Sequence, residues 1–148
     1  MKRPIEILLV ENHPGDIRLT REVFSEGQLS NRLHVVEDGV EAMAFLRRAG
    51  AFATRPRPDL ILLDLNLPRK DGRQVLQEIK LDEQLKVIPV VVLTTSKAEE
   101  DILRAYRLHA NCYITKPIDL NEFIRVVKSI EGFWLETARL PHGTNGSA

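Results

Sequence analysis

Short, almost unbroken apolar runs alternate with longer amphipathic stretches along this chain. The runs cover residues 5–10, 33–36, 60–63, 90–93 and 112–114. A strand that is apolar at nearly every position is covered on both faces, as strands of a parallel sheet are. Helical spacing of apolar residues marks the stretches 16–24, 40–46, 72–81 and 98–108, and a last one that begins at Asp119. Five strand–helix units predict an α/β domain with right-handed crossovers around a parallel sheet.

Composition narrows the class of protein further. The chain has 148 residues, of which 43% are hydrophobic and 28% charged, as expected of a globular domain that folds without disulfides or metal. Lys plus Arg and Asp plus Glu number 21 each, so no basic field favours nucleic acid or a membrane surface as partner. The single cysteine, Cys112, excludes a disulfide framework. With no signal peptide and no apolar stretch long enough to span a bilayer, we expect a cytoplasmic location.

Polar residues follow four of the predicted strands at the point where each strand ends. These residues are Glu11 and Asn12, Asp64, Thr94 and Thr95, and Thr115 and Lys116. Ligands of an open parallel sheet bind outside the carboxyl ends of its strands. We therefore expect acids, a hydroxyl and a lysine to meet at one edge of the sheet.

This combination of groups suits phosphoryl transfer to a carboxylate. A carboxylate that attacks phosphorus needs a divalent cation, held by neighbouring oxygens, so that two anions can approach each other. A lysine supplies fixed positive charge, and a hydroxyl donates a hydrogen bond to a phosphoryl oxygen. Aspartyl phosphate is an established covalent species in proteins.

The chain resembles the receiver domain of two-component response regulators. The matching stretches are 7–12 (ILLVEN), 62–68 (LLDLNLP), 71–72 (DG), 93–95 (LTT) and 113–117 (YITKP), and the likeness spans roughly residues 5–130. It implies a doubly wound, flavodoxin-like (β/α)5 fold with a five-stranded parallel sheet in the strand order 2-1-3-4-5. Residues 68–72 and 131–135 more narrowly resemble the single-domain regulators paired with bacterial and cyanobacterial phytochrome histidine kinases.

The resemblance implies a role for each residue of a phosphoryl site. Asp64 would be the phosphoacceptor, Lys116 would bind the phosphoryl group, and Thr94 would be the switch hydroxyl. The backbone of Asn66 and of Thr95 would also bind phosphate. Together these groups predict a domain that phosphorylates itself and acts on no other substrate.

The resemblance also implies a Mg²⁺ site. Its ligands would be Glu11, Asn12, Asp64 and the backbone carbonyl of Asn66. The family usually has aspartate where this chain has Asn12, and metal affinity falls as ligand charge falls. We therefore expect weakened Mg²⁺ binding and slower phosphorylation. Asp16 is not expected to replace the missing charge, because it should lie inside the first helix.

Two conformational features complete the likeness. Tyr113 would be the aromatic side chain whose rotamer responds to phosphorylation. The peptide bond between Lys116 and Pro117 would be cis, an isomer that is rare outside proline.

The last predicted helix carries more apolar residues than a receiver core needs. They recur at helical spacing and continue past Gly132: Phe123, Val126, Val127, Ile130, Phe133 and Trp134. An exposed apolar patch often marks a protein interface, so we expect a homodimer through this helix and the elements beside it. The alternative is a tail folded back on its own domain. We expect residues 1–140 to form the receiver domain with an extended last helix and 141–148 to form a flexible tail.

The sequence thus predicts a single-domain response regulator that takes a phosphoryl group on Asp64 from a histidine kinase, of phytochrome type, and signals to a downstream protein by contact. The alternative is a pseudo-receiver, an interaction module whose metal site Asn12 impairs. An aspartyl phosphatase would want a second acid two residues after the nucleophile, where this chain has Asn66. A flavin site is disfavoured by the acidic loop after the first strand, and the dinucleotide and P-loop motifs are absent.

Overall fold

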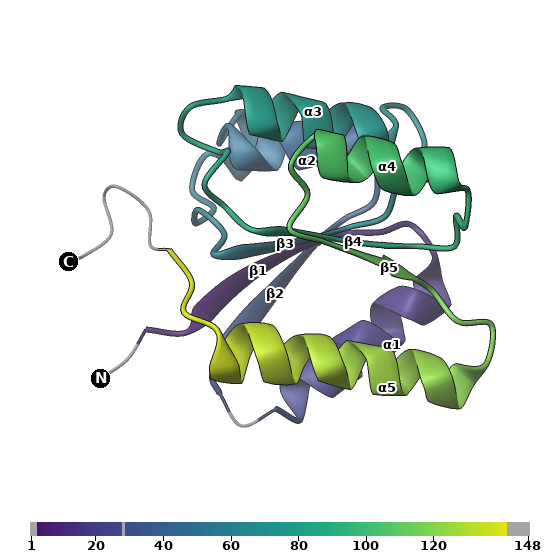
Figure 1. Ribbon diagram of the computed structural model, residues 1–148. Coiled ribbons are helices and arrows are strands. Elements are labelled where there is room, and N and C mark those ends of the chain that lie inside the picture. The colour runs from purple at the N-terminus through teal and green to yellow at the C-terminus, as the bar shows by residue number, and fades with distance from the viewer. Residues whose placement is uncertain (1–2, 28, 142–148) are drawn as a thin grey trace.

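A five-stranded parallel sheet forms the centre of the protein. The computed structural model describes residues 3–27 and 29–141. The strands lie in the order β2-β1-β3-β4-β5, which confirms the predicted doubly wound fold (Figure 1). Their bounds are β1 Ile5–Val10, β2 Asn31–Val36, β3 Leu60–Leu63, β4 Val90–Thr94 and β5 Cys112–Thr115.

Helices cover both faces of the sheet. They are α1 Pro14–Ser25, α2 Gly39–Leu46, α3 Gly72–Leu81, α4 Glu99–Arg107 and α5 Leu120–Ile130, with a 3-10 turn η1 at Gly50–Phe52 and a π-helix η2 at Glu131–Thr137. Figure 1 shows α2, α3 and α4 on one face and α1 and α5 on the other. Right-handed crossovers place α1 and α2 on opposite faces because the direction of strand addition reverses after β2, and they keep α2, α3 and α4 on one face. Helix α5 follows the last strand and is not part of a crossover.

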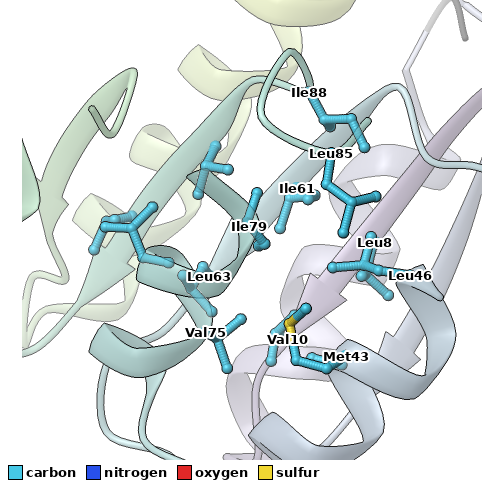
Figure 2. Packing of buried hydrophobic residues seen from close by; sticks show 14 of the residues in the cluster. Leu8, Val10, Met43, Leu46, Ile61, Leu63, Val75, Ile79, Leu85 and Ile88 are labelled. Carbon is cyan, nitrogen blue, oxygen red and sulfur yellow. The ribbon is translucent and has the colours of Figure 1, made fainter. Parts of the chain in front are cut away.

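Alternate residues of the central strands face opposite helical layers, which explains the unbroken apolar runs. One buried cluster joins Leu8 and Leu63 to α2 and α3, and Figure 2 shows these side chains interlocking with Met43, Val75 and Ile79. The other buried cluster joins the alternate strand residues to α1 and α5. It includes Ile7, Leu9, Leu60, Leu62, Phe24, Phe123 and Val127. Both faces of β1 and β3 are therefore buried, which favours apolar residues at nearly every position; the exception is the buried Glu6 of β1, which bonds His34.

The register of the sheet brings the strand ends level with one another. Val10 of β1 pairs with Leu63 of β3, so the residues that follow each, Glu11 and Asp64, are neighbours at the same edge. At the other side of the sheet, Thr94 of β4 pairs with Thr115 of β5, and Lys116 follows directly. Parallel pairing thus collects the polar residues at the carboxyl edge.

Local side-chain caps fix the starts of α1, α2, α3 and α5. Asp119, where the last helical stretch was expected to begin, is the N-cap of α5 and accepts a hydrogen bond from the backbone N–H of Glu122 at 3.0 Å. Helix α1 begins at Pro14, two residues earlier than predicted, because proline fits the first helical position. Residues 142–148 of the predicted flexible tail lie outside the described residues. None of the helices among the described residues has the length and apolarity to cross a membrane.

Candidate functional site

Charged side chains from three strand ends and one helix meet at the carboxyl edge of the sheet. The Nζ of Lys116 donates to Glu11 Oε1 at 2.5 Å and to Asp64 Oδ2 at 3.2 Å. It also donates to Asp16 Oδ2 at 2.9 Å. Glu11, Asp64 and Lys116 were predicted to meet, and the structure brings them together. Asp16 does lie inside α1, as expected, yet its carboxylate reaches the cluster.

The cluster is almost completely removed from water. The exposed fractions of Glu11, Lys116 and Asp64 are 3%, 5% and 7%. Buried charges are tolerated only when they are paired and hydrogen-bonded. Here one ammonium serves three carboxylates, so the site keeps an excess of negative charge. Such a site attracts a further cation.

Burial and charge move the pKa values of this cluster in opposite directions. Burial raises the pKa of Glu11 to about 7, although the ammonium of Lys116 opposes the shift. Burial lowers the pKa of Lys116, but the charge of Glu11 and the hydrogen bonds to Glu11 and Asp16 outweigh it, so this pKa lies above its ordinary value. The lysine is therefore a permanent positive charge beside Asp64.

The loop after β3 presents the Asp64 carboxylate. The backbone N–H of Asn66 donates to Asp64 Oδ1 at 3.2 Å, while Oδ2 faces Lys116. Gly72, the first residue of α3, lies so close that an added Cβ would meet the carbonyl oxygen of Asp64 and the Cα of Leu65. The loop is thus packed against the start of α3, which fixes the position of Asp64.

The other predicted ligands lie around this loop. Asn12 and Asn66 are exposed; Asn12 directly follows Glu11, and Asn66 lies two residues after Asp64. Within the part of the chain that the structure describes, no three or more His, Cys, Asp or Glu residues form a group arranged to hold a metal ion. Two of the four expected ligands are the asparagines Asn12 and Asn66, and the ammonium of Lys116 lies within hydrogen-bond distance of both Glu11 and Asp64.

The predicted switch residues lie at the end of β4 and in β5. Thr94 is fully buried, and its Oγ1 accepts from the backbone N–H of Ser96 at 3.5 Å. Thr95 is exposed at the edge of the sheet. The hydroxyl of Tyr113 donates to the carbonyl oxygen of Ser96 at 3.0 Å, and burial raises the pKa of this hydroxyl. One residue, Ser96, therefore contacts both predicted switch side chains.

A salt-bridge network that the sequence did not indicate continues from Ser96 toward the Asp64 loop. Ser96 Oγ donates to Asp101 Oδ2 at 2.6 Å, and Asp101 receives two hydrogen bonds from Arg73, at 2.8 and 2.6 Å. Arg73 also bonds Asp71 at 2.9 Å and the carbonyl oxygen of Leu65 at 3.5 Å. The contacts connect the residue after Asp64 to the first turn of α4. No motif in the sequence pairs positions 73 and 101, because they meet only when α3 and α4 are adjacent.

One expectation for this edge is wrong. The structure contains no cis peptide bond in residues 3–27 and 29–141, so the bond between Lys116 and Pro117 is trans. Trans is the intrinsically favoured isomer before proline, even though the preference is small there. Lys116 reaches the acids from this trans arrangement.

Known proteins match both the sequence and the fold. A sequence model of the family described as the response regulator receiver domain matches residues 7–128. The response regulator Rcp1 of Synechocystis sp. is 53% identical over 138 residues, which cover 93% of this chain and 94% of Rcp1.

Solved structures of response regulators are also similar to this chain. The crystal structure of the Mn²⁺-bound form of Rcp1 has a TM-score of 0.93 at 52% identity and covers 94% of this chain and 100% of its own. The phosphorylated cyanobacterial phytochrome response regulator RcpA has a TM-score of 0.92 at 54% identity and covers 95% and 100%. The predicted resemblance is confirmed, and nothing in these comparisons supports the pseudo-receiver alternative.

Proposed function

Because this chain belongs to the response regulator receiver family, we propose that it is a switch in which Asp64 accepts a phosphoryl group from a histidine kinase. The observation that carries the proposal is the contact of 3.2 Å between Asp64 Oδ2 and Lys116 Nζ at the carboxyl edge of the sheet. It joins a carboxylate nucleophile to the fixed positive charge that phosphoryl transfer requires.

The chemistry follows from the groups around Asp64. A carboxylate oxygen of Asp64 forms the new O–P bond while the N–P bond of the kinase phosphohistidine breaks. The imidazole leaves with the electron pair, and a carboxylate nucleophile gives up no proton. Lys116, the backbone N–H groups of Asn66 and Thr95 and the hydroxyl of Thr94 then neutralise the phosphoryl oxygens.

Receiver domains bind a divalent metal, and we propose Mg²⁺ at this site. Oxygen is the ligand atom that Mg²⁺ prefers, and the residues here fit because Glu11, Asn12, Asp64 and the carbonyl of Asn66 all offer it. The excess of carboxylates over ammonium supports the same conclusion. When bound, the metal would neutralise charge between Asp64 and the incoming phosphoryl group.

The kinase proposed as partner is of phytochrome type. The support comes from the similarity to RcpA, which is described as a phytochrome response regulator, over 95% of this chain.

We propose that the protein works in the cytoplasm, that residues 1–140 form the receiver domain, that it phosphorylates only itself, and that it passes the signal on by protein contact. Charge added at Asp64 would bias the partly buried contacts of Thr94 and Tyr113 with Ser96.

A homodimer through α5, η2 and neighbouring elements is part of the proposal. Phe133 is 53% exposed and packs edge-on against Trp134, with ring centroids 5.3 Å apart. An aromatic side chain left in water favours burial against a partner. Size-exclusion chromatography with light scattering should give a dimer mass that falls to the monomer mass in Phe133→Asp. A monomer mass for the unsubstituted protein would contradict the homodimer.

Phosphorylation is tested with acetyl phosphate and Mg²⁺ on a phosphate-retarding gel. We expect a retarded band for the unsubstituted protein and none for Asp64→Asn. Asp119→Asn is the matched control, because asparagine keeps the N-cap of α5 and the same charge is lost at an exposed position. A retarded band in Asp64→Asn, or no band in the unsubstituted protein at millimolar Mg²⁺, would contradict the assignment.

A further inference from the structure

Asp16 is the member of the charged cluster that does not come from a strand end. Its Oδ2 lies 2.9 Å from Lys116 Nζ, closer than the 3.2 Å between Asp64 Oδ2 and the same ammonium. The side chain is 19% exposed, so most of its surface is withdrawn from water. Asp16 is therefore as much a part of the cluster as Asp64 is.

The position of Asp16 is fixed by the start of α1. Pro14 occupies the beginning of the helix, and His13 is its N-cap. His13 Nδ1 accepts the backbone N–H of Asp16 at 3.2 Å, which ties the first turn to the loop after β1. An acid in the first turn is also favoured by the helix dipole. Asp16 is thus held beside the site by its own helix and does not depend on Lys116 for its place.

The charge of the site depends on this residue. Asn12, next to Glu11, is neutral at a place where the resemblance implies an aspartate. With Asp16 included, three carboxylates surround one ammonium; without it, two would remain. Cation affinity rises with the number of anionic ligands and neighbours in a site.

We propose that Asp16 supplies the negative charge that Asn12 lacks and so sustains divalent-cation binding beside Glu11 and Asp64. The inference rests on the proposed function, which places a cation there. Asp16 is a positioning residue that acts through Lys116. The carboxylate of Asp16 pairs with the ammonium of Lys116. This pairing weakens the repulsion between that ammonium and a cation bound at Glu11 and Asp64.

The experiment is a titration with Mn²⁺ alone, with free Mn²⁺ measured by electron paramagnetic resonance. The proteins are the unsubstituted chain, Asp16→Asn, Asn12→Asp and the double variant. Glu22→Gln is the matched control, because it removes one negative charge from an exposed position on the same helix. Asp64→Asn shows which binding belongs to this site, and thermal unfolding of each protein checks that it is folded.

We expect Asp16→Asn to weaken Mn²⁺ binding about tenfold, as loss of a supporting partner does in other metal sites. The same substitution should have a much smaller effect in the Asn12→Asp background, and Glu22→Gln should bind like the unsubstituted chain. Equal affinity in Asp16→Asn and the unsubstituted chain would overturn the inference, and so would an equal loss in both backgrounds.

If Mn²⁺ binds only to the proteins that carry Asn12→Asp, Asp16 does not compensate and the inference is overturned. Phosphorylation of Asp64 is measured separately on the phosphate-retarding gel. Failure of the inference about Asp16 can therefore be distinguished from failure of the proposed function. Retention of the bound Mn²⁺ by Asp64→Asn would place the binding elsewhere and would also overturn the inference.

Discussion

Lys116 is the residue whose removal the charged cluster tolerates least. The ammonium is the partner of Glu11, Asp16 and Asp64, and all of these groups except Asp16 are nearly inaccessible to water. Lys116→Met would leave the carboxylates unpaired and is expected to lower the free energy of unfolding by about 3 kcal/mol. Asp64→Asn instead removes one of several repelling carboxylates.

Urea unfolding at neutral pH checks this contrast. Asp64→Asn is expected to keep the free energy of unfolding within about 1 kcal/mol of the unsubstituted protein or to raise it. The assignment of Lys116 as the neutralising group would be wrong if Lys116→Met were as stable as Asp64→Asn.

Gly72 is required by close approach of two backbone segments. A Cβ at this position would collide with the carbonyl oxygen of Asp64 and the Cα of Leu65, and backbone atoms cannot rotate away. Gly72→Ala is therefore expected to cost about 2 kcal/mol of stability and to displace the Asp64 loop. Gly132→Ala is the control, because a Cβ there meets nothing within 4 Å. Thermal unfolding of both variants tests this, and equal melting temperatures would contradict it.

The elements α3 and α4 are joined by the paired hydrogen bonds of Arg73 with Asp101. The hydrogen bonds from Arg73, helped by that from Ser96, hold the pKa of Asp101 well below its ordinary value. A lowered pKa in the folded state means that the bond stabilises the protein above the ordinary pKa, about 4, and that this stability is lost as the pH falls below it. Asp101→Asn should cost about 1 kcal/mol at pH 6.

Chemical denaturation at pH 6 and at pH 3 measures this difference. The gap in stability between the unsubstituted protein and Asp101→Asn should narrow at the lower pH. Asp71→Asn is the matched control, because asparagine can still cap α3 and Asp71 is the more exposed of the two acids that pair with Arg73. A gap that stays constant or widens toward pH 3 would refute the role given to Asp101.

For the whole molecule, the segment after α5 has one buried and one exposed apolar side chain. Leu135 is 4% exposed and joins the cluster of α1 and α5, whereas Phe133 is 53% exposed. Leu135→Ala is expected to lower stability by about 3 kcal/mol, as other buried leucines do. Phe133→Ala should leave the stability of the monomer unchanged within about 0.5 kcal/mol.

Unfolding at low protein concentration, where a dimer would dissociate, separates these effects. Equal losses for Leu135→Ala and Phe133→Ala would show that the segment packs only on its own domain. One face of this segment packs on the core, as the fold-back alternative expected, whereas Phe133 remains exposed and the homodimer stays a proposal.

The fold could be predicted from the sequence alone because both faces of β1 and β3 are buried. A strand buried on both faces is almost continuously apolar in the sequence. The polar residue that follows each run must then lie at the carboxyl edge of the sheet. Glu11, Asp64 and Lys116 were predictable in this way. Asp119 was predictable too, because an N-cap is a contact within four consecutive residues.

The remaining features depended on distances in space that no local pattern records. Asp16 reaches Lys116 because α1 starts at Pro14 and its first turn lies beside the end of β5. The position of Asp16 within a predicted helix does not by itself indicate this contact. Arg73 and Asp101 meet because α3 and α4 lie on the same face of the sheet. Residues of one strand or one helix turn are coupled by the chain itself, whereas contacts between elements are set by how the side chains of the core pack.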